Sequence, residues 1–213
     1  MAKAARSDRL RTPKFRLSFP SVFEPRAFKE GQKAKYGFMA LFDKEAQKTP
    51  QFKAMVEAVR KVVQEEWQGK PPKSLKLPFK KGERLQNDIT GEYYGGCDEH
   101  TVAISVQSDF APEILNQKKH LLRKGVADEE AQIYAGCYCI ATLSFQAVNM
   151  PENRCVTVYL GNLMKVGEGE SLGGKVSADK DFADVESIEV DDVDIDLNSE
   201  DAEETSELDD LPS

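Results

Sequence analysis

The sequence predicts a mainly β fold, a small closed barrel of five strands with one amphipathic helix inserted between the early strands. Two patterns lead to this prediction. Several segments alternate between apolar and polar residues, as half-buried strands do, and one segment has the apolar spacing of a long helix. Because helices do not alternate with strands along the chain, the pattern argues against a parallel α/β sheet.

A break in charge divides the chain, whose 213 residues carry a formal net charge of −8. Residues 179–213 contain 16 acidic side chains and one lysine, and the preceding 178 residues hold 28 basic against 21 acidic side chains. Like charges repel, so such a tail cannot collapse into a core. We therefore expect three parts: a basic flexible arm (1–12), one domain (13–174) and a disordered acidic tail (175–213), with a glycine-rich linker at 167–174.

The first two strands are predicted near the N-terminus. In residues 14–23, Phe15, Leu17 and Phe19 alternate with polar residues and form the expected inward face. Residues 35–42 (KYGFMALF) are nearly continuous in apolar character, as expected for a second, more buried strand.

One amphipathic helix follows, with Thr49 as its N-cap and Pro50 at its first position. Apolar residues recur from Phe52 to Trp67 at helical spacing, and charged residues occupy the other face. We expect this helix to cover the core with Trp67 buried.

Three later segments are predicted as strands: 100–106, 136–149 and 155–166. The last two form a hairpin, in which Phe145 belongs to the core and Gly161 indicates a bulge. Between the first two, residues 113–135 are polar and are expected to hold one short helical turn.

The four cysteines, Cys97, Cys137, Cys139 and Cys155, lack a Cys-x-x-Cys pair of the kind that structural zinc sites use. We expect reduced, mostly buried thiols and no metal or other cofactor. No apolar run approaches the roughly 20 residues of a membrane span, and residues 1–11 do not resemble a secretory signal. The pattern predicts a cytoplasmic protein.

Catalytic motifs are missing from the sequence: it has no nucleophile elbow, phosphate-binding P-loop or dinucleotide fingerprint. We therefore expect a protein that is not an enzyme. A metal-dependent nuclease stays open as a weak alternative, with Asp98, Glu99 and Asp109 as the acids available outside the tail.

Basic residues interleaved with aromatic ones indicate a binding surface for single-stranded nucleic acid. Residues 1–84 hold 21 Lys and Arg against nine acids. A positive groove can hold phosphates while aromatic faces stack on bases, whatever the base sequence. We expect stacking by Tyr36, Phe38, Tyr93 and Tyr94. Phosphate contacts are expected from Lys14, Arg16, Lys33, Lys35, Lys80, Lys81 and Arg84.

Two stretches resemble a family of phage single-stranded DNA-binding proteins with an OB-fold. One is RLSFPSVF (16–23), followed by Glu24-Pro25, a glycine loop and Lys35-Tyr36; the other is YAGCY (134–138), followed by the predicted hairpin and Gly167-Glu168. The resemblance spans residues 14–174 and implies a five-stranded OB-fold barrel that works on single strands in DNA replication, recombination and repair. Acidic tails of similar proteins often end in an aromatic residue, whereas this chain ends in Leu211-Pro212-Ser213.

These observations favour sequence-independent binding and protection of single-stranded DNA. The acidic tail is expected to recruit replication proteins, such as a polymerase, helicase or primase, and to compete with DNA. The alternative is a non-enzymatic scaffold or chaperone-like protein whose basic face binds an acidic protein. The sequence leaves open the oligomeric state and the choice between DNA and RNA. If a phage encodes the chain, the host cytoplasm is its expected location.

Overall fold

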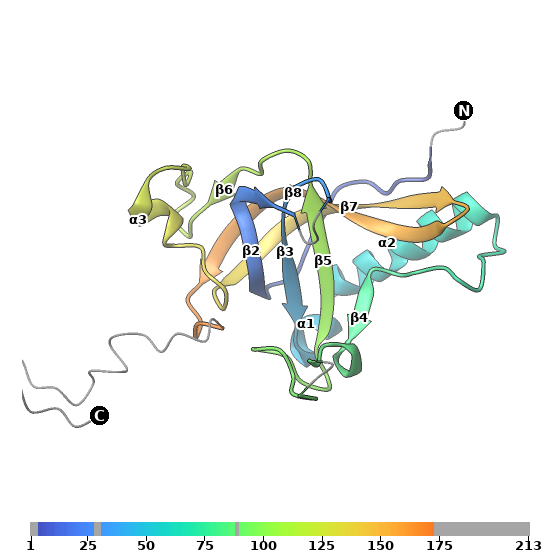
Figure 1. Cartoon of the computed structure of the whole chain (residues 1–213), viewed down its shortest axis with the longest axis horizontal. Coiled ribbons are helices and arrows are strands. Elements are labelled where there is room, and N and C mark those ends of the chain that lie inside the picture. Colours follow the sequence, from blue (N-terminus) through green and yellow to red (C-terminus); the bar gives the residue numbers. More distant parts are fainter. Residues whose placement is uncertain (1–3, 28–30, 88–89, 173–213) are drawn as a thin grey trace, which may run out of the picture. The chain divides into compact units, whose positions relative to one another are not determined.

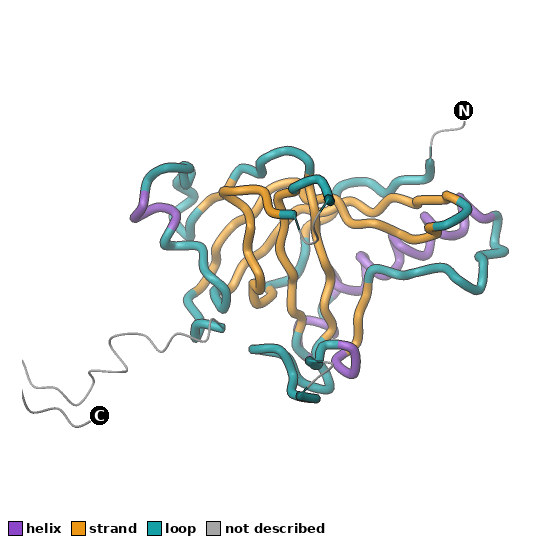
Figure 2. The backbone as a smooth tube through the Cα atoms, viewed as in Figure 1, coloured by secondary structure: helices purple, strands orange, loops and turns teal. Residues whose placement is uncertain are grey.

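The computed structural model describes residues 4–27, 31–87 and 90–172, and most of the regular structure in them is β (Figures 1 and 2). The expected acidic tail lies outside the described residues. The elements are β1 (Leu10–Arg11), β2 (Phe15–Arg26), β3 (Lys35–Phe42), α1 (Lys44–Lys48), α2 (Pro50–Trp67), β4 (Phe79–Lys81), a 3₁₀ turn (Gly82–Arg84), β5 (Val102–Ser108), β6 (Ile114–Leu115), α3 (Ala127–Glu130), β7 (Tyr138–Met150) and β8 (Asn153–Gly167).

Five long strands form a ring of pairings. β2 pairs with β3, β3 with β5, β5 with β8, β8 with β7, and β7 again with β2. All of these pairs are antiparallel except β5 and β8, which run parallel with Gln107 opposite Tyr159. The short strands β1, β4 and β6, which the sequence analysis did not predict, extend this arrangement beside β7, β5 and β8. The prediction of a mainly β fold is confirmed.

The core fills the inside of this ring. The ring of Phe15 on β2 stacks on Phe38 of β3, with centroids 5.4 Å apart, and Phe42 meets Phe52 of α2 at 5.3 Å. Phe145 is fully buried, as expected. Alternate residues of each strand point inward because successive side chains of a strand face opposite sides.

Helix α2 is present at the predicted position. The Thr49 side chain accepts a hydrogen bond from the backbone N–H of Phe52, and Pro50 is the first helical residue. Met55 and Val59 are buried, and α2 packs beside the β7–β8 hairpin (Figure 1). Trp67, expected in the core, is half-buried and packs against it. None of the described helices is long and apolar enough to cross a membrane.

The hairpin of β7 and β8 contains the predicted bulge. Ala141 pairs with Leu163 and Leu143 pairs with Leu160, so two residues of β8 lie opposite one residue of β7. Gly161 is one of these two, and the neighbouring Asn162 N–H donates to Thr142 Oγ1 at 2.9 Å.

The described part of the N-terminal segment, which was predicted to be a flexible arm, instead pairs with the sheet. Residues 5–12 lie along β7: Ser7 N–H donates to the Phe145 carbonyl at 2.8 Å, and Thr12 N–H donates to the Ala141 carbonyl at 2.9 Å. β2 pairs with β7 only through Phe15 and Arg16. The rest of that edge of β7 would otherwise be unpaired, and residues 5–12 satisfy it.

Candidate nucleic-acid interface

An exposed aromatic pair stands where β2 is irregular. Phe19, which the alternation assigned to the core, is 56% exposed, and its ring meets that of Tyr94 edge-on with centroids 6.3 Å apart and an interplanar angle of 83°. We call Phe19 and Tyr94 the aromatic corner. Two rings at a right angle that face solvent offer surfaces on which a planar base can stack.

The backbone explains why Phe19 leaves the core. The register between β2 and β3 shifts between Ser18 and Ser21, and Phe19 has a φ of 48°. A left-handed φ costs a residue other than glycine about 1–3 kcal/mol and occurs preferentially at functional sites. The sequence signal for the irregularity was Pro20, because a proline has no N–H to donate and so interrupts strand pairing.

The four predicted stacking residues differ in exposure. Tyr93 and Tyr94 are 39% and 41% exposed. Tyr36, at the start of β3, is half-buried. Phe38 is 3% exposed and stacks on Phe15, so its assignment to the binding surface is wrong. It shares the inward face of β3 with Ala40 and Phe42, because alternate residues of a strand face the same side.

A second exposed aromatic group lies beyond the end of β5. Phe110 is 81% exposed, and the Ser108 hydroxyl hydrogen-bonds to both the N–H and the carbonyl of Phe110. The neighbouring Asp109 carboxylate contacts Lys33 Nζ at 3.1 Å and Lys35 Nζ at 3.8 Å. The hydrogen bond from Lys33 lowers the pKa of Asp109. The structure thus brings Lys33 and Lys35 together, beside a ring that the sequence analysis missed.

Two of the predicted phosphate contacts, Lys14 just before β2 and Arg16 within it, are held by other contacts. The ammonium of Lys14 lies 4.8 Å from the centroid of the Tyr138 ring. Arg16 Nη2 donates to the carbonyl of Glu170 at 2.7 Å, while Arg16 Nε is buried and has no hydrogen-bond partner among the described residues.

The remaining predicted bases extend to the opposite end of β5. Lys80 and Lys81 are exposed on β4, where Lys81 pairs with Val102, and exposed Arg84 ends the following turn. Tyr94 N–H donates to the Leu85 carbonyl at 2.9 Å, which ties the aromatic corner to this turn. Tyr36 lies opposite Ser108 at the other end of β5. Val102 and Ser108 are the two ends of β5, six residue steps or about 20 Å apart.

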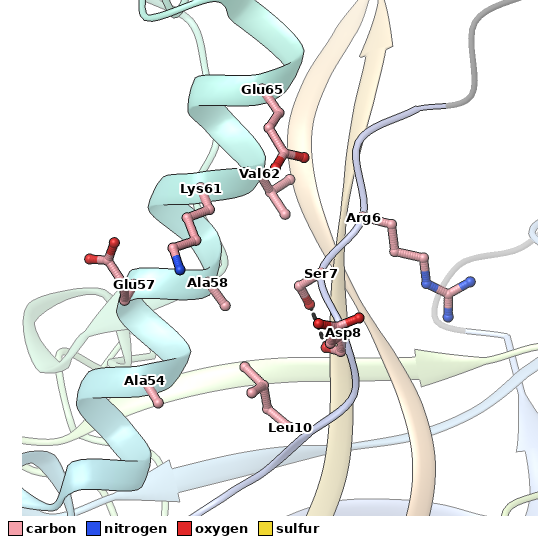
Figure 3. A pocket seen from close by; sticks show the side chains of 10 residues that line it. All are labelled: Arg6, Ser7, Asp8, Leu10, Ala54, Glu57, Ala58, Lys61, Val62 and Glu65. Atoms are coloured by element: carbon pink, nitrogen blue, oxygen red, sulfur yellow. Dashed lines mark hydrogen bonds between the residues drawn. The ribbon is translucent and has the colours of Figure 1, made fainter.

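A separate groove lies between α2 and residues 6–10 (Figure 3). Its volume is about 340 Å³, and no aromatic side chain lines it. Arg6 and Lys61 are balanced there by Asp8, Glu57 and Glu65. Such mixed charge without rings is unsuited to a single strand, which needs positive charge and stacking faces.

The thiols and acids do not assemble a metal site in the described part of the chain, where no three His, Cys, Asp or Glu side chains are grouped to hold an ion. Cys137 and Cys139 are buried with their Sγ atoms 3.7 Å apart. The hydrogen bond from Cys139 lowers the pKa of Cys137 to about 7 and raises that of Cys139. Asp98 accepts hydrogen bonds from Thr101 and His100, so its carboxylate is used within its own turn.

Comparisons with known proteins agree with the resemblance drawn from the sequence. The single-stranded DNA-binding protein of bacteriophage Enc34 in complex with single-stranded DNA is 20% identical, with a TM-score of 0.65 over 78% of this chain and 89% of that chain. Its C-terminal truncation is 17% identical, with a TM-score of 0.61 over 80% of this chain and 98% of that chain. No curated protein sequence matches significantly.

The family model described as the Enterobacter phage Enc34 single-stranded DNA-binding protein matches residues 9–194. Because this match covers most of the 213 residues, the chain belongs to the family of Enc34-type phage single-stranded DNA-binding proteins.

Proposed function

We propose that this chain binds single-stranded DNA without base specificity, in phage DNA replication, recombination and repair. The observation that carries the proposal is the aromatic corner: Phe19 is exposed in a strained left-handed conformation and its ring meets Tyr94. The apolar surface of an exposed aromatic ring is unfavourable in water, and stacking on a base would remove part of that surface from water. Membership of the family supports the same ligand.

The topology fits a five-stranded OB-fold barrel made of β2, β3, β5, β8 and β7. This proposal is supported by the ring of pairings and by its single parallel pair, β5 with β8. OB-folds bind oligonucleotides on the face of their second and third strands and on the loops after the first and fourth strands. Here these strands are β3 and β5. The loop after β2 includes Lys33, next to Lys35 and Phe110.

We assign phosphate binding to lysines and arginines along this face. The net positive charge of residues 1–178 would attract the phosphates electrostatically. Lys33, Lys35, Lys81 and Arg84 lie near the two ends of β5. The DNA would therefore run along about 20 Å of strand between them. Affinity should fall as salt rises, with a log–log slope of about −0.7 for each phosphate engaged.

The acidic tail, 175–213, is proposed to compete with DNA and to recruit replication proteins such as a polymerase, helicase or primase. A tethered polyanion reaches an effective concentration of order millimolar near a basic face. Deleting residues 179–213 should therefore tighten DNA binding, most strongly at low salt. Equal affinities of the full-length and shortened chains at every salt concentration would contradict competition.

We infer that the chain acts by binding alone, without catalysis, in the cytoplasm of the phage host. The deciding experiment is fluorescence anisotropy with labelled single-stranded DNA, duplex DNA and RNA oligonucleotides of equal length. The proposal expects tight, salt-dependent binding of single-stranded DNA of any base composition and weaker binding of the duplex. Failure to bind any oligonucleotide would refute it, and release of labelled fragments with added magnesium would favour a nuclease.

A further inference from the structure

The five residues after β8 are docked onto the protein instead of forming the start of a free linker. We call residues 168–172 the strap. Glu168 Oε1 lies 2.7 Å from Lys165 Nζ, and its other oxygen lies 2.8 Å from the Tyr134 hydroxyl. Further along, Leu172 N–H donates to the Ala135 carbonyl at 2.8 Å. The part of the predicted linker that the structure describes after β8, residues 168–172, is therefore held by the protein.

Leu172 covers an apolar patch on the outer face of the sheet. Met39 and Leu41 of β3 alternate with inward-facing residues and so point away from the core. Together with Ala103 of β5 and with Leu85 and Cys97 they form the outer apolar patch, against which Leu172 packs. Because Cys97 N–H donates to the Tyr94 carbonyl at 2.9 Å, this patch directly adjoins the aromatic corner.

Glycines make room for the strap. Gly136 has a φ of 118°, and a Cβ there would collide with the Glu170 carbonyl. Gly96 has a φ of 79°, and a Cβ there would lie 2.8 Å from the Leu172 side chain. A larger residue at Gly136 would have to displace the backbone of the strap, and one at Gly96 would have to shift the Leu172 side chain.

The strap also occupies a basic group of the binding face. Arg16 donates to the Glu170 carbonyl through Nη2, while its buried Nε has no partner among the described residues. A guanidinium bound to one neutral carbonyl has donors to spare, and it binds a phosphate more strongly because both groups are then charged and the contact is often bidentate.

We propose that the outer apolar patch is a nucleobase site, which Leu172 fills in the free protein and vacates when single-stranded DNA binds. This inference rests on the proposed function. A base has an apolar face that fits Met39, Leu41 and the sulfur of Cys97, and it would lie beside the ring of Tyr94. The phosphate of the same nucleotide takes Arg16 from Glu170.

Displacement of the strap has a consequence for the tail. In the sequence, only six residues separate Leu172 from the acidic segment 179–213. The first two of these six are Gly173 and Gly174. When DNA takes the place of Leu172, the last residue of the strap leaves the binding face. DNA occupancy and detachment of the residue that leads into the acidic segment are thereby coupled through one leucine.

The test uses the full-length chain with Leu172→Cys, in a Cys155→Ser background so that Cys97 is the partly exposed natural thiol. Diamide should join the introduced thiol to Cys97 by taking two electrons and two protons from the two thiols. The joined protein should bind oligothymidine about tenfold or more weakly than the same protein after dithiothreitol. Failure of the thiols to join, or equal affinity in both states, overturns the inference.

Two further arms separate a base from a phosphate as the displacing group. Oligothymidine should slow the joining of the thiols, whereas an abasic oligonucleotide of equal length should slow it far less. Equal slowing by both would show that no base enters the patch. In a chain with only Leu172→Ala, affinity should rise about three- to thirtyfold, since a half-buried leucine no longer competes.

Failure of this inference can be distinguished from failure of the proposed function. If the reduced protein binds oligothymidine and yet neither the disulfide nor Leu172→Ala changes the affinity, the nucleobase site is refuted and single-strand binding stands. If the unmodified chain does not bind oligothymidine, the proposed function is refuted as well.

Discussion

Replacing the two rings of the aromatic corner should weaken DNA binding without unfolding the protein. Both side chains are exposed, Phe19 at 56% and Tyr94 at 41%, so neither truncation opens a cavity in the core. We expect the variants Phe19→Ala and Tyr94→Ala to fold and to bind single-stranded DNA more weakly.

The expected magnitude follows from the stacking of one base on each ring. Base–aromatic stacking contributes about 1–3 kcal/mol per base, which corresponds to an increase in Kd of about 5- to 150-fold. Because the two centroids lie only 6.3 Å apart, the rings support each other. The double variant should therefore lose less than the sum of the single losses, by about 0.5–1.5 kcal/mol.

The backbone of Phe19 provides an internal control. A left-handed φ of 48° is strained for alanine and relaxed for glycine. Phe19→Gly should thus be more stable than Phe19→Ala by about 1–2 kcal/mol in urea unfolding, while both lose the same DNA affinity. Leu121→Ala removes a side chain of similar exposure, 51%, and should leave the affinity unchanged.

Fluorescence anisotropy with labelled oligothymidine gives the affinities, and circular dichroism confirms the fold. If Phe19→Gly and Tyr94→Ala both bind as tightly as the unmodified chain, the aromatic corner does not contact DNA. If affinity instead follows stability across the Phe19 variants, the ring acts through folding and the stacking argument is refuted.

Three other predictions concern charge, core and metal. Asp109→Asn should raise DNA affinity, most clearly at low salt, because Lys33 and Lys35 lose the carboxylate that competes with phosphate; an unchanged salt titration would contradict this. Phe38→Ala should lower the free energy of unfolding by about 3–5 kcal/mol, since Phe38 is a buried core residue, and a normal urea midpoint would show otherwise. Treatment with a chelator should leave the melting temperature unchanged; a large drop with stoichiometric zinc by elemental analysis would refute the buried-thiol interpretation of Cys137 and Cys139.

Periodicity and capping predicted the long elements well, because both are local. Thr49 and Pro50 determined the start of α2, and Gly161 indicated the bulge in β8. The short strands β1, β4 and β6 could not be predicted, because two or three residues carry no period of their own. Their pairing depends on partners far along the chain, such as Thr142 opposite Arg11.

The candidate site was predicted less well than the fold. Composition identified the basic and aromatic segments, yet it could not distinguish an inward ring from an outward one at an irregularity. Alternation assigned Phe19 to the core, and only the shift of register after Ser18 turns it outward. Phe110 was missed because its exposure depends on a short turn closed by the Ser108 hydroxyl.

Photochemical crosslinking of the full-length chain to oligothymidine, followed by mass spectrometry of the peptides, locates the DNA-binding face. We predict crosslinks in three peptides, those that contain Phe19, Tyr94 and Phe110, and we predict that excess unlabelled single-stranded DNA removes them. Crosslinks confined to α2 and residues 6–10, which line the groove of mixed charge, would place the DNA on another face and refute binding at the aromatic corner.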